Sequence, residues 1–198
     1  MHVRVSTSTG TANIDEAVQI VKERILPAVR EQRGFVTLSA SGDRSTGRFT
    51  VMTVWETAAD RDASEGLAEK LRSEGMETLG GEMHVERFEQ VVFERGEIPP
   101  GPAAKLHIRE VKMDPATVDD NLIFFKETVV PDMKAMPGFI GVRSLIDRKT
   151  GEGRVGSVWA DEESLKRQLE KSAQRRAMAG ERGIEFGDDY VSDILFTS

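Results

Sequence analysis

The sequence predicts an α+β protein in which one β-α-β-β-α-β unit occurs twice. Three observations predict this fold class: a gapless internal repeat, a proline-rich segment between the two copies, and the same order of strand and helix patterns in each copy. We therefore expect a first copy over residues 1–95, a linker over 96–104 and a second copy over 105–198.

The repeat consists of identical residues spaced 104 positions apart, and it includes the only two Trp residues of the chain (159 − 55 = 104). The matching positions are Pro27, Gly34, Phe35, Asp43, Arg44, Thr46, Gly47, Val54 and Trp55, which recur as Pro131, Gly138, Phe139, Asp147, Arg148, Thr150, Gly151, Val158 and Trp159. The segment between the copies holds three of the seven Pro residues, which is typical of a stiff linker.

Local patterns give each copy the same elements. The expected strands are 3–7, 35–41, 48–55 and 84–93 in the first copy, and 106–111, 139–146, 154–159 and 190–196 in the second. A first helix follows the opening strand, and a more polar second helix covers about 58–72 and about 162–178. This order is that of the ferredoxin-like motif.

The first helix of each copy has recognisable signals at its start and near its end. Asn13 and Thr117 are the predicted N-cap residues, because an acidic residue follows each of them three positions later. Pro27 and Pro131 occupy equivalent positions, where the missing backbone N–H is expected to kink the helix or to end its regular part.

The strands do not alternate apolar and polar residues as a half-exposed sheet would. Residues 49–55 and 139–142 offer apolar or Thr side chains to both faces. The sheet face without helices therefore needs a cover, and we expect the two sheets to pack as an intramolecular pseudo-dimeric α+β barrel. The alternative is two separate domains that each pair with another chain.

Composition excludes several classes of protein. The chain has no Cys, so disulfide scaffolds and Cys-ligated zinc sites are ruled out. The net charge of −7 argues against a nucleic-acid surface. No run of about 18 apolar residues predicts a membrane span. We expect a cytoplasmic protein that binds neither nucleic acid nor membrane, as a monomer with an internal pseudo-dimer or a weak homodimer.

The repeated motifs resemble those of antibiotic-biosynthesis-monooxygenase-like (ABM) domains of the dimeric α+β barrel superfamily, here in tandem. The resemblance covers both copies and rests on Pro-x6-Gly-Phe, the Asp-Arg-x-Thr-Gly hairpin and Val-Trp at the end of the third strand. It implies a cleft between sheet and helices, and for some members oxygenation of an aromatic substrate without a cofactor. Haem-degrading members use a His on the second helix, which this chain lacks.

The resemblance implies that Trp55 and Trp159 line such clefts, and with Phe35 and Phe139 they are the candidate substrate-binding residues. The alternative for both Trp residues is that they fill the core.

Three residues are candidate catalytic groups. His107 is the candidate general base, because its ring alternates away from Leu106 and an unperturbed imidazole titrates near neutral pH. Arg109 and Arg143 are candidates to face a substrate phenolate. The alternatives are a structural His and a rim ion pair for Arg143. No His or carboxylate cluster has metal-ligand spacing, so we expect no metal site.

The sequence leaves function between two classes of protein. One is a cofactor-independent monooxygenase, or a related small-molecule enzyme, for an aromatic substrate. The other is a non-catalytic protein, which either binds a small hydrophobic molecule or is a structural duplicate with filled clefts. The second cleft is expected to be the roomier, because Phe49 and Met52 correspond to Gly153 and Gly156. The basic residues of the last helix are interpreted as a solvated face, namely Lys166, Arg167, Lys171, Arg175 and Arg176.

Overall fold

The computed structural model describes all 198 residues, which form two compact units. Unit 1 comprises Met1–Phe88 and Asp193–Ser198, and unit 2 comprises Glu89–Ser192. The predicted copies, 1–95 and 105–198, are defined by sequence correspondence, whereas the units are defined by contacts. The two divisions differ because the last strand of each copy is long and divides between the units.

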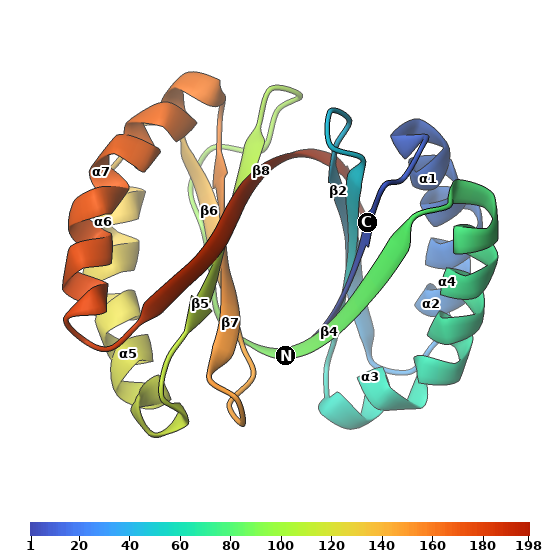
Figure 1. Ribbon diagram of the computed structural model, residues 1–198, viewed down its shortest axis with the longest axis horizontal. Helices are drawn as coiled ribbons and strands as arrows, with labels where there is room; N and C mark the ends of the chain where they lie inside the picture. Colours follow the sequence, from blue (N-terminus) through green and yellow to red (C-terminus); the bar gives the residue numbers. More distant parts are fainter. The chain divides into compact units, whose positions relative to one another are not determined.

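Unit 1 places a helical layer on one face of an antiparallel sheet (Figure 1). Its strands are β1 (His2–Thr9), β2 (Phe35–Asp43), β3 (Arg48–Trp55), the start of β4 (Glu82–Arg95) and the end of β8 (Glu185–Thr197). Its helices are α1 (Ile14–Ile20), η1 (Val21–Ile25), α2 (Leu26–Arg30), α3 (Ala58–Ala63) and α4 (Glu65–Leu79). β3 lies between β1 and β2, and the end of β8 pairs with the other edge of β2.

Unit 2 repeats this arrangement. Its strands are β5 (Lys105–Lys112), β6 (Phe139–Ile146), β7 (Glu152–Trp159), the end of β4 and the start of β8. Its helices are η2 (Pro115–Thr117), α5 (Val118–Phe124), η3 (Phe125–Val129), α6 (Val130–Lys134) and α7 (Glu162–Gly180). β7 lies between β5 and β6, and the end of β4 pairs with β6.

The order of hydrogen-bonded strands is β1-β3-β2-β8-β5-β7-β6-β4, and it closes on itself. This is the order of an eight-stranded barrel, in which β4 and β8 each have neighbours from both copies. The predicted fold class, two ferredoxin-like units in one closed α+β barrel, is therefore confirmed. No helix of the chain is both long enough and apolar enough to span a membrane.

The proline in the first helix of each copy changes the helix without ending it. A π-helical turn, η1 or η3, precedes Pro27 and Pro131, and helical structure then continues to Arg30 and Lys134. At the end of each wider turn a backbone N–H donates to the carbonyl five residues earlier, from Leu26 to Val21 and from Val130 to Phe125. Both π turns contribute side chains to the cavities described below.

The predicted caps are confirmed in part. The side chain of Asn13 accepts a hydrogen bond from the backbone N–H of Glu16 at 3.2 Å. Thr117 occupies the N-cap position of α5, but its side chain makes no capping bond. Asp114 instead caps the short η2 turn, through a 2.8 Å bond from the backbone N–H of Ala116.

The repeated Asp-Arg-x-Thr-Gly segment forms the hairpin between the two central strands and ties it to the first helix. Asp43 accepts hydrogen bonds from the backbone N–H and the hydroxyl of Ser45, at 2.8 and 2.7 Å. Arg44 pairs with Asp15 at 2.5 Å, and the equivalent Arg148 pairs with Asp119 at 2.8 Å. The motif therefore recurs because both of its charged residues have structural partners.

Candidate functional site

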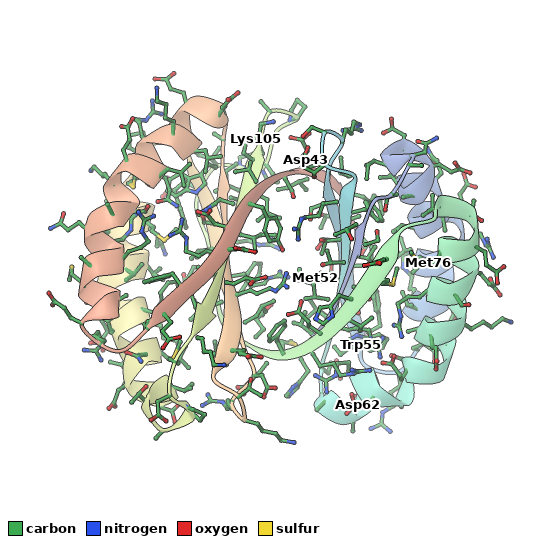
Figure 2. The ribbon with its side chains drawn as sticks, in the orientation of Figure 1. Asp43, Met52, Trp55, Asp62, Met76 and Lys105 are labelled. Carbon is green, nitrogen blue, oxygen red and sulfur yellow. The ribbon has the colours of Figure 1, made fainter.

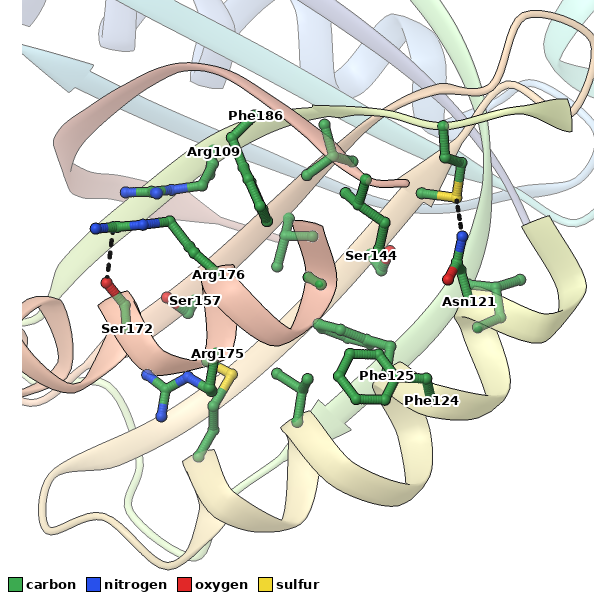
Figure 3. Close-up of a pocket in the computed structure, with 18 of the residues that line it drawn as sticks. Arg109, Asn121, Phe124, Phe125, Ser144, Ser157, Ser172, Arg175, Arg176 and Phe186 are labelled. Atoms are coloured by element: carbon green, nitrogen blue, oxygen red, sulfur yellow. Dashed lines mark hydrogen bonds between the residues drawn. The ribbon is translucent and has the colours of Figure 1, made fainter. Parts of the chain in front are cut away.

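A cavity of about 120 Å³ lies in unit 2, between the sheet and the helices η3 and α7 (Figure 3). The equivalent cavity of unit 1 is about 70 Å³. The prediction that the second cleft is the roomier is thus confirmed. The unit 2 cavity is lined by His107, Arg109, Val111, Met113, Asn121, Leu122, Phe124, Phe125, Val129, Met133, Ser144, Ile146, Val155, Ser157, Gln168, Ser172, Arg175, Arg176, Ala179, Ile184 and Phe186.

Only one of the two substitutions behind this prediction involves a cavity residue. Phe49 lines the unit 1 cavity, and the corresponding Gly153 carries no side chain. The second predicted cause, the change from Met52 to Gly156, is wrong. Met52 leaves β3 on the face opposite Trp55 and lines neither cavity, because side chains alternate along a strand (Figure 2).

The apolar part of the unit 2 cavity is aromatic. Phe124 ends α5, Phe125 begins the π turn, and Phe186 comes from β8. Met133 of α6 adds a thioether, a polarisable group that packs well against aromatic rings. A flat aromatic ligand would therefore find both ring and thioether contacts here.

The polar part of the cavity carries three guanidinium groups, from Arg109, Arg175 and Arg176 (Figure 3). Arg109 on β5 pairs with Asp189 of β8, and Arg175 on α7 pairs with Asp132. Arg176 donates a hydrogen bond to the hydroxyl of Ser172 at 2.9 Å and has no carboxylate partner.

The charges of this region do not balance. Three guanidinium groups are always protonated, and two carboxylates pair with them. Burial, followed by the repulsion of Arg176, lowers the pKa of Arg109 although Asp189 opposes this effect. One positive charge therefore remains, and a bound monoanion would neutralise it.

His107 lines the cavity and is held by a chain of hydrogen bonds. Its Nε2 is 3.2 Å from Oδ2 of Asp189, and its Nδ1 is 3.5 Å from Nε2 of Gln168. The amide oxygen of Gln168 accepts from Arg175 at 2.5 Å, so its nitrogen faces His107 as a donor. These contacts fit a neutral imidazole that carries its proton on Nε2 and has its lone pair on Nδ1.

The titration of this pair follows from its surroundings. Burial lowers the pKa of His107, and the hydrogen bond to Asp189 opposes this effect without cancelling it. Burial alone would raise the pKa of Asp189, but the hydrogen bond from His107 and the charge of Arg109 outweigh it and lower that pKa. The imidazole is thus uncharged, and the carboxylate charged, at neutral pH.

The structure brings together two of the three predicted catalytic residues. His107 and Arg109 lie two positions apart on β5, on the face that lines the cavity. Arg143 lies on β6, where its neighbour Ser144 lines the cavity and Arg143 itself does not. The guanidinium of Arg143 lies 4.6 Å from the ring centroid of Phe93. Burial, reinforced by the charge of Arg95, lowers the pKa of Arg143 to about 10.

The predicted substrate-binding aromatic residues line neither cavity. Trp55 and Trp159 are fully buried, and each packs edge-to-face against Phe35 or Phe139 with ring centroids 5.7 and 5.6 Å apart. Each indole N–H donates a 3.0 Å hydrogen bond to the hydroxyl two residues earlier, on Thr53 or Ser157. Those hydroxyl residues do line the cavities, so each Trp contacts a cavity-lining residue without lining the cavity itself.

The interpretation of the last helix as a solvated face needs a correction. Arg175 and Arg176 line the cavity together with Gln168, Ser172 and Ala179 of the same helix. The spacing 168, 172, 175, 176, 179 is that of one helical stripe, a signal that the mixed charges of the segment obscured. The role of Asp189 had no local signal, because its partners are 80 and 82 positions away in the chain.

No group of three or more His, Asp or Glu side chains is arranged to hold a metal ion.

Comparisons with known proteins give relatives without an assigned activity. No family model matches the sequence. The uncharacterized protein Rv2557 of Mycobacterium tuberculosis is 26% identical over 164 residues, which cover 83% of this chain and 73% of the relative. The uncharacterized protein Rv2558 of the same organism is 22% identical over 166 residues, covering 83% and 70%.

Solved structures show the same fold at low sequence identity. A "putative monooxygenase" from Fusobacterium nucleatum has a TM-score of 0.71 at 11% identity and covers 100% of this chain and 93% of its own. An anthrone oxidase-like protein has a TM-score of 0.68 at 14% identity, with 100% and 92% covered. A ferredoxin-fold protein from Listeria monocytogenes, related to antibiotic biosynthesis monooxygenases, has a TM-score of 0.56 at 11% identity, with 98% and 95% covered. The chain therefore has the fold of the ABM-like monooxygenase-related proteins, built from two ferredoxin-like units in one polypeptide.

Proposed function

We propose that the unit 2 cavity binds a small aromatic monoanion and that the protein is a cofactor-independent monooxygenase for such a substrate. The observation that carries the proposal is the pairing of a ring-lined apolar end with one uncompensated guanidinium, that of Arg176. The volume of about 120 Å³ suits a ligand of about one ring, since a cavity of about 150 Å³ holds benzene. Structural neighbours named monooxygenase and anthrone oxidase-like support the reaction class.

The residues of the cavity divide the proposed reaction between them. Nδ1 of His107 accepts a proton from an acidic ring CH2 group once Gln168 has moved from its 3.5 Å contact, and this turns a neutral substrate into the monoanion that the cavity holds. Asp189 stabilises the imidazolium so formed through its hydrogen bond to Nε2. Arg109 and Arg176 hold the oxygen on which the substrate's negative charge is delocalised.

The substrate anion then supplies the electrons. Its carbon forms a C–O bond with O2, and the resulting peroxide anion takes the proton from the His107 imidazolium to become a hydroperoxide. Nδ1 of His107 then accepts the second C–H proton as the O–O bond breaks and the carbonyl group forms, and the departing hydroxide takes that proton to become water. Overall a CH2 group and O2 become C=O and water, so the substrate loses the four electrons that O2 accepts.

A non-catalytic binding protein is the second candidate, and one observation favours it. Both nitrogens of His107 have partners, and Gln168 occupies the lone pair that a base needs. The same cavity would then hold the aromatic anion without turnover.

Two measurements test the proposal. Benzoate is titrated into the ¹⁵N-labelled protein, with neutral benzamide as the control, while the indole N–H signal of Trp159 is followed because its partner Ser157 lines the cavity. Oxygen uptake is then measured with phloroglucinol as the oxidisable probe, because it has a single ring and its keto tautomer carries an acidic ring CH2 group. Preferential binding of benzoate with oxygen uptake supports the monooxygenase, and binding without uptake supports the binding protein. No preference for the anion contradicts both.

A further inference from the structure

The cavity of unit 1 has a different chemistry from that of unit 2. Its walls are mainly aliphatic, from Ile20 and Ile25 on the first helix and Leu71, Met76 and Leu79 on α4. Its volume of about 70 Å³ is smaller than that of the unit 2 cavity, which favours a narrow ligand over a ring. The cavity could therefore enclose a short aliphatic chain.

Two arginines line this cavity together with the hydroxyl residues Ser6, Ser8 and Thr53. Arg4 on β1 is 3% exposed and lies against α3 and α4, where it donates to the carbonyl of Arg61 at 2.5 Å and to the hydroxyl of Ser64 at 3.1 Å. Arg72 on α4 lines the same cavity. A buried guanidinium at the end of an apolar cavity is a usual arrangement for binding a carboxylate.

One carboxylate serves three guanidinium groups here. Glu65 pairs with Arg4 at 2.9 Å, with Arg72 at 2.5 Å and with Arg87 at 2.9 Å. Burial lowers the pKa of Arg4, and the repulsion of Arg72 and Arg87 adds to this effect although Glu65 opposes it. Arg87 is 43% exposed and does not line the cavity, so Arg4 and Arg72 share one carboxylate and one positive charge is left without a counterion.

Two guanidinium donors at this place also lack a hydrogen-bond partner. They are Nε of Arg4 and Nη1 of Arg72, and both atoms are buried. Oε2 of Glu65 also lacks a hydrogen bond, but it lies 2.9 Å from Nη2 of Arg4 and of Arg87, so its ion pairs are with those atoms. Buried N–H groups without acceptors are costly, and charged ones more so. The missing acceptors and the missing negative charge would both be supplied by a ligand carboxylate.

We propose that the unit 1 cavity is a second binding site, which takes a short-chain aliphatic monocarboxylate. Its alkyl chain lies among the Ile, Leu and Met side chains, and its carboxylate accepts from the free donors of Arg4 and Arg72. The two copies then bind different anions, an aliphatic one in unit 1 and an aromatic one in unit 2.

The two Trp residues give each site its own reporter. The indole N–H of Trp55 donates to Thr53, which lines the unit 1 cavity, and that of Trp159 donates to Ser157, which lines the unit 2 cavity. Butanoate is titrated into the full ¹⁵N-labelled chain, with butanamide as the neutral isostere. We expect a saturable shift of the Trp55 indole signal with butanoate. The dissociation constant for butanamide should be at least about tenfold higher.

Substitutions on α4 locate the site. Gly75 is buried and lines the cavity, and a Cβ there would meet no atom within 4 Å, so Gly75→Leu is expected to place its side chain in the cavity. Gly66 lies on the exposed side of the same helix, which makes Gly66→Leu the matched control. Gly75→Leu should abolish the Trp55 response, and Gly66→Leu should keep it. Arg72→Gln should raise the dissociation constant about tenfold.

Three results would overturn the second site: no saturable Trp55 shift with butanoate, equal responses to butanoate and butanamide, or butanoate binding by Gly75→Leu that equals the wild type. Because Gly75→Leu replaces a helical glycine, it is expected to fold, so the test does not depend on removing Arg72 from its ion pair. The Trp159 signal reports separately on unit 2, so failure of the aromatic site and failure of this site are distinguishable.

Discussion

Replacing Arg176 by Gln tests whether the uncompensated charge of the unit 2 cavity selects anions. The substitution removes the one guanidinium of the cavity that has no carboxylate partner and leaves the pairs of Arg109 and Arg175 in place. Two guanidinium groups then face two carboxylates, so the cavity becomes neutral. We expect affinity for benzoate to fall and affinity for benzamide to stay the same.

The size of the effect follows from the position of the side chain. A unit charge about 4 Å from a bound anion is attracted by roughly 4 kcal/mol at an effective dielectric constant of about 20, before the cost of removing water. Net values for hydrogen bonds to charged groups are about 1.5–3 kcal/mol. Arg176 is only half-buried, so solvent screens it and the lower end applies. The dissociation constant for benzoate should therefore rise about tenfold.

Lys171→Gln is the matched control for this measurement. Lys171 lies exposed on the same helix and does not line the cavity, so the variant has the same net charge as Arg176→Gln. Calorimetric titration of both variants with benzoate separates the effect of direct contact between Arg176 and the anion from the effect of net charge at long range. Equal losses of affinity in the two variants, or no loss in either, would refute the assignment of Arg176 to the anion.

Three further predictions concern stability. The pKa of His107 is lowered mainly by burial, so its contribution to stability is complete above about pH 6.5 and is lost as the pH falls toward the lowered value. Chemical denaturation between about pH 5 and pH 7 should show this loss. The same pH dependence of the unfolding free energy in His107→Gln would contradict it. Gly47 and Gly151 both have positive φ, at 67° and 71°, so Gly47→Ala should cost about 1–2 kcal/mol. Gly151→Ala should cost at least about twice as much, because its methyl group would overlap a backbone carbonyl; equal melting temperatures would argue against this. Trp159→Phe should lower the free energy of unfolding by about 2 kcal/mol through lost packing and one lost hydrogen bond, yet change benzoate affinity less than about twofold. A large loss of affinity would instead make Trp159 a ligand contact.

Much of the fold was predictable because its signals are local and occur twice. Asn13 caps a helix through a residue three positions away, and Asp43 folds a hairpin through residues two and three positions away. The helix through Pro27 was harder to predict, since a π turn precedes the proline and the helix continues past it. Strand ends were also underestimated, because the outer parts of β4 and β8 gain their partners from distant strands.

The candidate site was predictable only where strand alternation alone placed the side chains. His107 and Arg109 share a strand face by their spacing, and they meet in the cavity as that spacing requires. Arg143 had the right chemistry, but its position on β6 turns it to the other face, one residue from Ser144. The Trp residues were attractive as ligand contacts by type, yet in each copy a smaller hydroxyl residue stands between the indole and the cavity.

By itself the sequence determined the duplication, the order of elements and the residues that could carry positive charge, because these follow from spacing and side-chain chemistry within a few positions. Tertiary structure alone decided which charges remain unpaired. Asp189 reaches His107 and Arg109 across about 80 residues, and Arg176 faces the cavity without such a partner. The physical reason is that charge compensation depends on distance in space, and burial raises the energetic cost of a charge without a partner.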